Sequence, residues 1–139
     1  MTPEDKQLLF KDLCARLPYG VIVRVHDIEH GDFDSYVDNI NISNACIETH
    51  PIDELTIPYV FYKLQDVKPY LRPMSSMTEE EEDEYRNIDN RSYYCPIDCA
   101  HIPASKRIDW FNANHFDYRG LIEKGLAIEV TEDNNPYKL

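Results

Sequence analysis

The N-terminal part of the chain places an apolar residue at every third or fourth position behind a polar start. Thr2 is followed by Pro3 and two acids, so the segment has a hydroxyl cap, a proline and favourable charge for a helix N-terminus. This spacing predicts an amphipathic helix from about Pro3 to Arg16, ended by Pro18 and Gly20. The apolar positions on its expected buried face are Leu9, Phe10, Leu13, Cys14 and Leu17.

The pattern then changes from helical spacing to alternation. Residues 21–29, VIVRVHDIE, place valines on one face and Arg24 and His26 on the other, which is typical of a strand with one dry face. Further strand-like stretches joined by short turns predict a small antiparallel sheet of four to five strands, which could curl into a barrel. The expected strands are 21–29, 33–42, 45–49 and 59–63, with turns at 30–32 and Asn44, a loop at 50–58 and a helical turn within 64–70.

A segment with two prolines and then a run of acids separates the strand-rich part from a helix-rich part. Pro69 and Pro73 are expected to end the sheet. Thr78, with Glu81 three residues later, matches a capping box and predicts a helix over about residues 79–88.

The C-terminal part alternates between polar stretches and helical signals, and residues 90–104 favour no element. Ser105 offers a cap for a helix that ends near Phe116, and Asp117 could cap a short helix through Glu123. Residues 126–130 are expected to form an edge strand before a frayed acidic tail.

Together these patterns predict a single α+β domain over residues 1–139, with an N-terminal helix, the antiparallel sheet and two to three helices packed on it. The strand-rich part covers about residues 1–70 and the helix-rich part about residues 77–130. A division into two domains near residues 70–78 is the alternative. One domain is favoured because neither part alone would carry much core.

The charge balance limits the possible partners. A formal net charge of −12 disfavours binding to a phosphate backbone, so nucleic acid is not an expected ligand. The polar start and the absence of a long apolar run predict a cytoplasmic protein without a membrane segment. In that reducing compartment the cysteines are expected as free thiols: Cys14, Cys46, Cys95 and Cys99.

The acidic run is the first candidate for function. It could mimic phosphates and occupy the basic groove of a nucleic-acid enzyme. The favoured interpretation is a solvated helix start, because carboxylates in a first turn suit the helix dipole. The run consists of Glu79, Glu80, Glu81, Glu82, Asp83 and Glu84.

Cys95, Cys99 and His101 have the ligand types of a zinc site, which Asp98 or His115 could complete. Structural zinc sites more often contain paired C-x2-C motifs, and no second pair is present. Incidental thiols are therefore favoured, and no cofactor is expected.

A second cluster resembles an active site in composition. His115, Asp117, Tyr118 and Arg119 supply a base, a carboxylate, a phenol and a cation within five positions. Neighbours in sequence rarely converge on one substrate, so a structural role is favoured, with Asp117 as a helix cap and Arg119 paired with an acid. A Cys-His nucleophile is likewise disfavoured, because Cys14 lies on the predicted apolar face; its candidate partners are His26, His30 and His50.

The aromatic residues near position 110 allow two interpretations. Trp110 and Phe111, with Phe116 and Tyr118, could form an exposed platform for a partner protein. Packing of the helix onto the sheet is the more frequent use of such residues, and some could serve both purposes.

Three segments resemble a group of uncharacterised small proteins of gut Bacteroidales and of their phages and mobile elements. They are KDLCARLPYGV (11–21), VKPYLRPMSSMTEEEEDEY (67–85) and DWFNANHFDYRGLIEKGLAIE (109–129), about a third of the chain. The resemblance implies a common fold and lineage and assigns no catalytic residue. We therefore expect a non-enzymatic interaction or accessory protein with a protein partner or self-association. The alternatives are an acidic decoy that inhibits a nucleic-acid enzyme and a small hydrolase or transferase using residues 115–119.

Overall fold

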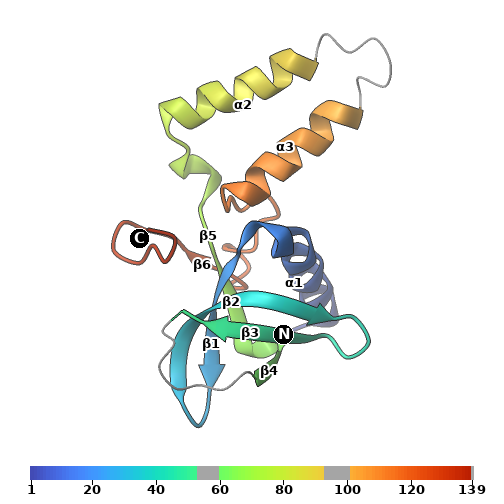
Figure 1. The fold of residues 1–139 in the computed structure, drawn as a ribbon, viewed down its shortest axis with the longest axis vertical. Helices are drawn as coiled ribbons and strands as arrows, with labels where there is room; N and C mark the ends of the chain where they lie inside the picture. The colour runs from blue at the N-terminus through green and yellow to red at the C-terminus, as the bar shows by residue number, and fades with distance from the viewer. Residues whose placement is uncertain (53–59, 93–100, 139) are drawn as a thin grey trace.

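The computed structural model describes residues 1–52, 60–92 and 101–138, and Figure 1 shows the path of the chain. It contains three α-helices, six strands and three short 3-10 helices within those residues. The elements in chain order are α1 (Pro3–Arg16), η1 (Leu17–Tyr19), β1 (Ile22–Asp27), β2 (Gly31–Asn41), β3 (Cys46–Pro51), β4 (Val60–Lys63), η2 (Leu64–Asp66), β5 (Val67–Leu71), η3 (Met74–Ser76), α2 (Glu79–Ser92), α3 (His101–Ala113) and β6 (Ile128–Glu129).

The strands of the described residues form one open sheet in the order β4-β3-β2-β1-β5-β6. All neighbouring strands pair antiparallel except β5 and β6, which run parallel. The predicted α+β class is therefore confirmed. The sheet is mixed and has six strands instead of four to five antiparallel ones, and it does not close into a barrel because β4 and β6 lie at opposite edges.

The hydrophobic core lies between α1 and the sheet. Leu9 and Leu13 of α1 are fully buried in the same cluster as Val21, Val23 and Val25. The alternation predicted for β1 is confirmed at positions 23–26, since Arg24 and His26 are exposed on the other face, whereas Ile22 on that face is buried. The predicted helix bounds are confirmed as well, and Thr2 Oγ1 accepts a hydrogen bond from the Asp5 backbone N–H at 3.1 Å.

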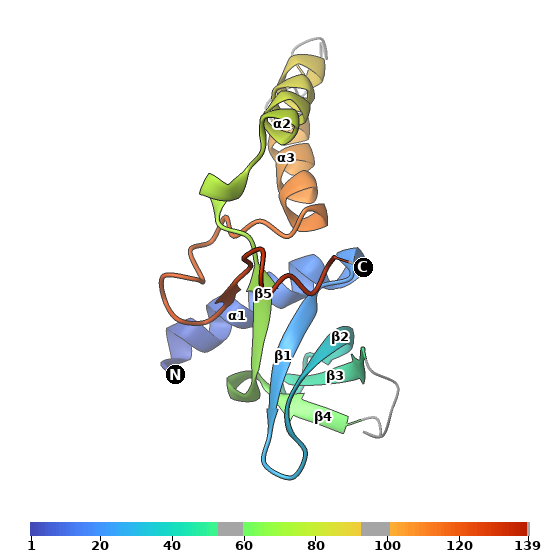
Figure 2. The same ribbon diagram turned by 90° about the vertical axis from the view of Figure 1, so that its left-hand side faces the viewer.

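The helices α2 and α3 do not pack on the sheet as predicted. They form a hairpin that projects away from the sheet, beyond the end of β5, as Figures 1 and 2 show. The helices lie against each other near the hairpin root, where Tyr85 of α2 stacks on Phe111 of α3 with ring centroids 5.4 Å apart. The first turns of α2 are acidic and offer no apolar face for the sheet, and the aromatic side chains of α3 pack on Tyr85 and Phe116 instead.

Pro69 does not end the sheet, because it lies inside β5 opposite Val23 of β1. The parallel neighbour β6 pairs only with Tyr70 and Leu71, so the missing N–H of Pro69 interrupts no ladder on that side. The single helical turn predicted within residues 64–70 covers only η2, and residues 67–71 are a strand.

The remaining helix bounds differ by several residues. The helix α2 extends to Ser92, and α3 begins at His101 before the predicted cap at Ser105. The short helix expected after Asp117 is a series of turns over residues 121–125. The C-terminal tail is not frayed, since the Tyr137 hydroxyl donates to the Tyr70 carbonyl at 2.8 Å.

Candidate functional site

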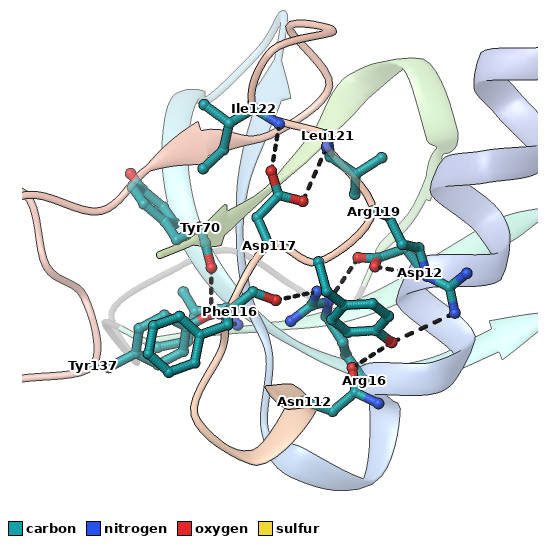
Figure 3. A network of polar contacts seen from close by, with 12 residues as sticks. Asp12, Arg16, Tyr70, Asn112, Phe116, Asp117, Arg119, Leu121, Ile122 and Tyr137 are labelled. Carbon is teal, nitrogen blue, oxygen red and sulfur yellow. Dashed lines mark hydrogen bonds and ion pairs between the residues drawn. The ribbon is translucent and has the colours of Figure 1, made fainter. Parts of the chain in front are cut away.

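The largest fully buried side chain of the described residues is that of Arg16, where α1 meets the segment after α3. Its Nε donates to Asp12 Oδ2 at 2.7 Å, and both side chains are completely buried. Its Nη2 donates to the Phe116 carbonyl at 2.6 Å (Figure 3). The four-residue spacing places the two charges on one side of the helix. The bond from Arg16 to the Phe116 carbonyl then connects α1 to a distant part of the chain.

Arg119 approaches the same aspartate from the other side. Its Nε lies 3.2 Å from Asp12 Oδ1, but the two atoms are not aligned as a hydrogen bond. Burial raises the pKa of the Asp12 carboxyl above its ordinary value, and the Arg16 guanidinium opposes that rise. Since an arginine keeps its proton in proteins, the ionised carboxylate is the form that neutralises the buried Arg16 and the partly exposed Arg119. The expected pairing of Arg119 with an acid is thus present.

Asp117 organises the turns that follow it. Its carboxylate accepts hydrogen bonds from the backbone N–H groups of Leu121 at 2.9 Å and Ile122 at 3.0 Å (Figure 3). Tyr118 is engaged elsewhere, with its hydroxyl donating to Asn112 Oδ1 at 2.8 Å. Both side chains therefore have structural partners.

His115 occupies a strained backbone position at the end of α3, with a φ of 63°. Its carbonyl accepts from the Arg72 N–H at 2.8 Å, and the Arg72 carbonyl accepts from the Asp117 N–H at 2.8 Å. Burial lowers the pKa of the imidazole to about 4, helped by the nearby charges of Arg16 and Arg72. The ring is therefore neutral at pH 7, and its buried Nδ1 has no hydrogen-bond partner among the described residues.

Tyr137 anchors the C-terminal tail beside this histidine. Its ring stacks on the His115 ring with centroids 3.7 Å apart and an interplanar angle of 9°. Its hydroxyl accepts from the Ile22 N–H at 3.1 Å and donates to the Tyr70 carbonyl. Because Val23 pairs with Pro69, Ile22 and Tyr70 stand opposite each other where the ladder would continue. The phenol thus bridges the strands β1 and β5 at this point.

A groove of about 580 Å³ lies next to His115, where the parallel strands β5 and β6 end. Of the four clustered candidates from the sequence, His115 lines it, whereas Asp117, Tyr118 and Arg119 do not. The four side chains therefore do not converge on one cavity. The groove is lined by Arg72, Ser76, Thr78, Ala113, Asn114, His115, Val130, Thr131, Glu132, Asn135, Tyr137 and Lys138.

The root of the hairpin is held by Arg72 and Glu81. The guanidinium donates to both carboxylate oxygens of Glu81, at 2.6 and 2.7 Å, and lies 4.2 Å above the Phe116 ring. The predicted capping box is also present, because the Thr78 N–H donates to Glu81 at 3.1 Å and the Glu81 N–H donates to Thr78 Oγ1 at 3.2 Å. The bonds from Arg72, and then those of the cap, lower the pKa of Glu81 to about 2.

The other members of the acidic run differ in their surroundings. Glu79 and Glu80 are exposed in the first turn. Glu82 and Asp83 share Arg86, at 3.6 and 3.4 Å, and Glu84 accepts from the Trp110 indole N–H at 3.2 Å. The run therefore combines a helix cap with an exposed surface that is richer in acids than in bases. The exposed members are Glu79, Glu80, Glu82, Asp83 and Glu84.

The aromatic residues form a continuous cluster at the hairpin root, with Trp110 stacked on Phe116 at 5.5 Å. Trp110 and Phe111 are only partly buried. Next to Phe111 lies a second groove, of about 360 Å³, between η3, α2 and α3. It is lined by Met74, Met77, Glu82, Tyr85, Arg86 and Phe111.

Much of the hypothetical zinc site lies outside the described residues, namely Cys95, Asp98 and Cys99, and the side chain of His101 is not described. Elsewhere in the described part of the chain, no three His, Cys, Asp or Glu side chains are grouped so that they could hold a metal ion.

The prediction that Cys14 lies on the apolar face of its helix is wrong, because the residue is exposed. The buried face turns instead toward Asp12 and Arg16. His26 Nδ1 lies 2.7 Å from Asp32, and His30 Nδ1 lies 3.3 Å from Asp27, so both belong to the β1–β2 hairpin. Cys46 is partly buried, and His50 is exposed at the end of β3.

Sequence reasoning missed Asp12, Arg16, Arg72 and Tyr137. A signal for the first two was present, because positions 9, 12, 13 and 16 lie on one side of a helix and two of them hold charged residues. A charged residue on the buried face of a helix indicates a buried partner of opposite charge. Glu81 lies nine positions from Arg72, which matches neither helical nor strand spacing. The partners of Tyr137 are distant in sequence, and no local pattern identifies them.

Comparison of the chain with models of protein families, with curated proteins and with solved structures finds no match in any of the three. Among the described residues, no helix combines the length and apolar character needed to span a bilayer.

Proposed function

We propose that this chain is a non-enzymatic interaction protein that binds a protein partner through the root of its α2–α3 hairpin. The observation that supports the proposal is the groove of about 360 Å³ lined by two methionines and two aromatic residues. Met74 is 40% exposed there. An exposed apolar groove on a projecting hairpin is the kind of surface that protein partners cover.

The hairpin root is suited to this role because it is held in place before any partner binds. The Arg72–Glu81 pair fixes the start of α2, and Ser76 Oγ donates to the Pro73 carbonyl at 2.7 Å, which closes the turn η3. A surface that is already ordered loses less conformational entropy on binding. Such a role also suits an accessory protein of a phage or mobile element, and the kinship suggested by the sequence is part of this proposal.

Affinity capture from a host lysate tests the proposal, together with light scattering for self-association. The wild-type chain is expected to retain a stoichiometric partner or to self-associate, and Met77→Asp is expected to lose that binding because it places a charge in the groove. Ile28→Asp is the matched control, since Ile28 is 94% exposed in the β1–β2 turn. Recovery of no stoichiometric partner, together with a monomer in solution, contradicts the proposal.

A second candidate is a small hydrolase or transferase centred on His115. It is favoured by the neutral imidazole beside a groove of about 580 Å³. It is less well supported, because Asp117, Tyr118 and Arg119 are committed to other partners. His115→Asn would abolish such an activity, whereas it would leave partner binding at the hairpin unchanged.

A further inference from the structure

The groove at the hairpin root also indicates the chemistry of its partner, an inference that rests on the proposed function. Its walls are Met74 and Met77 from the η3 segment, Tyr85 from α2 and Phe111 from α3. Methionine side chains are flexible and polarisable, so they adapt to anchors of different shape. A groove of this composition suits a large apolar side chain of the partner.

The charges at the rim are unbalanced. Glu82 and Arg86 line the groove, but Arg86 is shared with Asp83, so one cation faces two carboxylates. Glu79 lies one turn before Glu82 on the same side of α2 and is exposed. Glu80 adds another exposed carboxylate to the same turn. Arg107 also lies near the groove, with its guanidinium carbon 6.0 Å from the centre of the Tyr85 ring. Even with this second cation, the acids named above outnumber the bases.

The excess of acids beside an apolar groove points to a complementary partner. We propose that the groove binds a protein segment with one large apolar anchor residue and lysine or arginine residues beside it. The anchor fills the space between the two methionines and the two aromatic rings. The basic residues pair with Glu79 and Glu82 at the rim, where charges mainly set the association rate and the choice of partner.

This proposal differs from an acidic decoy in what it requires. A decoy depends on charge alone, so neutralising the acids would weaken its complex and changing the methionines would not. The groove requires both features, because the anchor supplies contact area while the rim supplies selectivity. The two sets of residues can be altered separately, since Met77 lies before the helix and Glu79 and Glu82 lie within it.

Selection from a displayed library of random short peptides tests the proposal on the full chain. The selected peptides are expected to share a large apolar residue flanked by Lys or Arg. Their affinities are then measured by fluorescence anisotropy against wild type and variants, and methionine methyl NMR reports where they bind. The signals of Met74 and Met77 are expected to shift on binding.

The variants separate the two requirements. Met77→Ala is expected to weaken binding more than about tenfold, the usual loss at an anchor contact. The pair Glu79→Gln and Glu82→Gln is expected to weaken it about five- to tenfold at low salt and less at high salt. The matched controls are Ile108→Ala, an exposed residue of α3, and the pair Glu29→Gln and Asp38→Asn, exposed acids of the sheet region; neither is expected to change affinity.

Each other outcome overturns the proposal. Selected peptides without basic residues, or affinities unchanged by the Glu79 and Glu82 variants, refute the partner chemistry while leaving the interaction function intact. Sensitivity to those acids without sensitivity to Met77→Ala indicates a charge-only decoy. Selection of no peptide refutes the groove as a segment-binding site, and lysate capture then decides separately whether the chain has any partner.

Discussion

Arg16 in α1 and Arg72 at the end of β5 both hold Phe116, the first through its carbonyl and the second through its ring face. Each arginine also pairs with an acid at similar distances, 2.7 Å for Asp12 and 2.6 Å for Glu81. The surroundings differ. The first pair is 0% exposed on both sides, whereas the side chains of Arg72 and Glu81 are 22% and 17% exposed.

The difference shows that the length of an ion pair does not decide its energetic role. Two charges taken fully out of water lose most of what they gain by pairing, but removing one of them leaves the other without compensation. A pair that water still reaches loses less solvation, and it responds to salt and pH. We therefore expect loss of one partner of the α1 pair to destabilise the packing of α1 strongly, and loss of the hairpin pair to affect mainly the start of α2.

The sharpest way to separate the two pairs is to remove Asp12. Asp12→Ala is expected to lower the free energy of unfolding by about 3–5 kcal/mol, because the buried Arg16 charge would lose its carboxylate partner. Urea unfolding followed by circular dichroism measures the loss. The double variant Asp12→Leu, Arg16→Met is expected to recover much of it, since it removes both charges and keeps the volume. A loss below about 1 kcal/mol in the single variant would show that water reaches this pair.

The hairpin pair is expected to show a smaller, pH-dependent effect. Glu81→Gln should cost about 1–2 kcal/mol at pH 7, less than the pKa shift alone implies because solvent screens the pair. The folded pKa of about 2 lies below the unfolded value of 4.5, so this stability is present above about pH 5 and is lost as the pH falls toward 2. Unfolding curves across this range measure the difference from wild type.

Glu80→Gln is the control for that experiment, because Glu80 is exposed in the same helical turn. It should change stability by no more than a few tenths of a kcal/mol. An equal effect of the two substitutions would mean that general acidity, and not the contact with Arg72, stabilises the start of α2.

His115 lies between the two regions and offers a second test by pH. Its folded pKa of about 4 lies below the unfolded value of 6.5, so the unfolded chain binds a proton that the folded chain does not bind between these values. Wild type is expected to lose about 1–2 kcal/mol more than His115→Asn as the pH falls from about 6.5 to 4. Asparagine suits the comparison because it tolerates a positive φ. An NMR titration of the His115 ring with a midpoint near 6.5 would disprove its burial as a neutral group.

The smallest expected effect concerns the helix cap. Thr78→Ala removes the hydroxyl that accepts from the Glu81 N–H and should cost about 1 kcal/mol, whereas Thr78→Ser should retain most of the stability. The same unfolding experiment measures both. If Thr78→Ala lowered the free energy of unfolding as much as Asp12→Ala, the hairpin root would contribute as much to stability as the buried pair of α1, contrary to the comparison above.

The elements that could be predicted from the sequence are those with local causes. The bounds of α1 follow from Thr2 and Pro3, and the alternation of β1 follows from its valines. The capping box at Thr78 joins residues three positions apart, so its spacing was visible in the sequence. The start of α3 was missed, because a cap signal at Ser105 competed with a helix that begins at His101.

The candidate site was harder to predict, because its contacts join distant segments. The sequence predicted that Asp117 caps a short helix and that Arg119 pairs with an acid. Arg119 does lie beside Asp12, but Asp117 caps a series of turns and not a helix. The sequence could not show that His115 would stack on Tyr137 or that the hairpin would project from the sheet. Both features depend on tertiary contacts between segments that are far apart in the sequence.

The sequence alone determines hydrogen bonds and hydrophobic spacing between residues a few positions apart. These determined the helix caps, the alternation of β1 and the acidic start of α2. The tertiary structure decided which charges are buried, because burial is a property of the surfaces that come together. The contact from Arg16 to the Phe116 carbonyl joins residues 100 positions apart. Only the meeting of α1 with the chain after α3 removes that guanidinium from water, and only the end of β5 beside α2 brings Arg72 to Glu81.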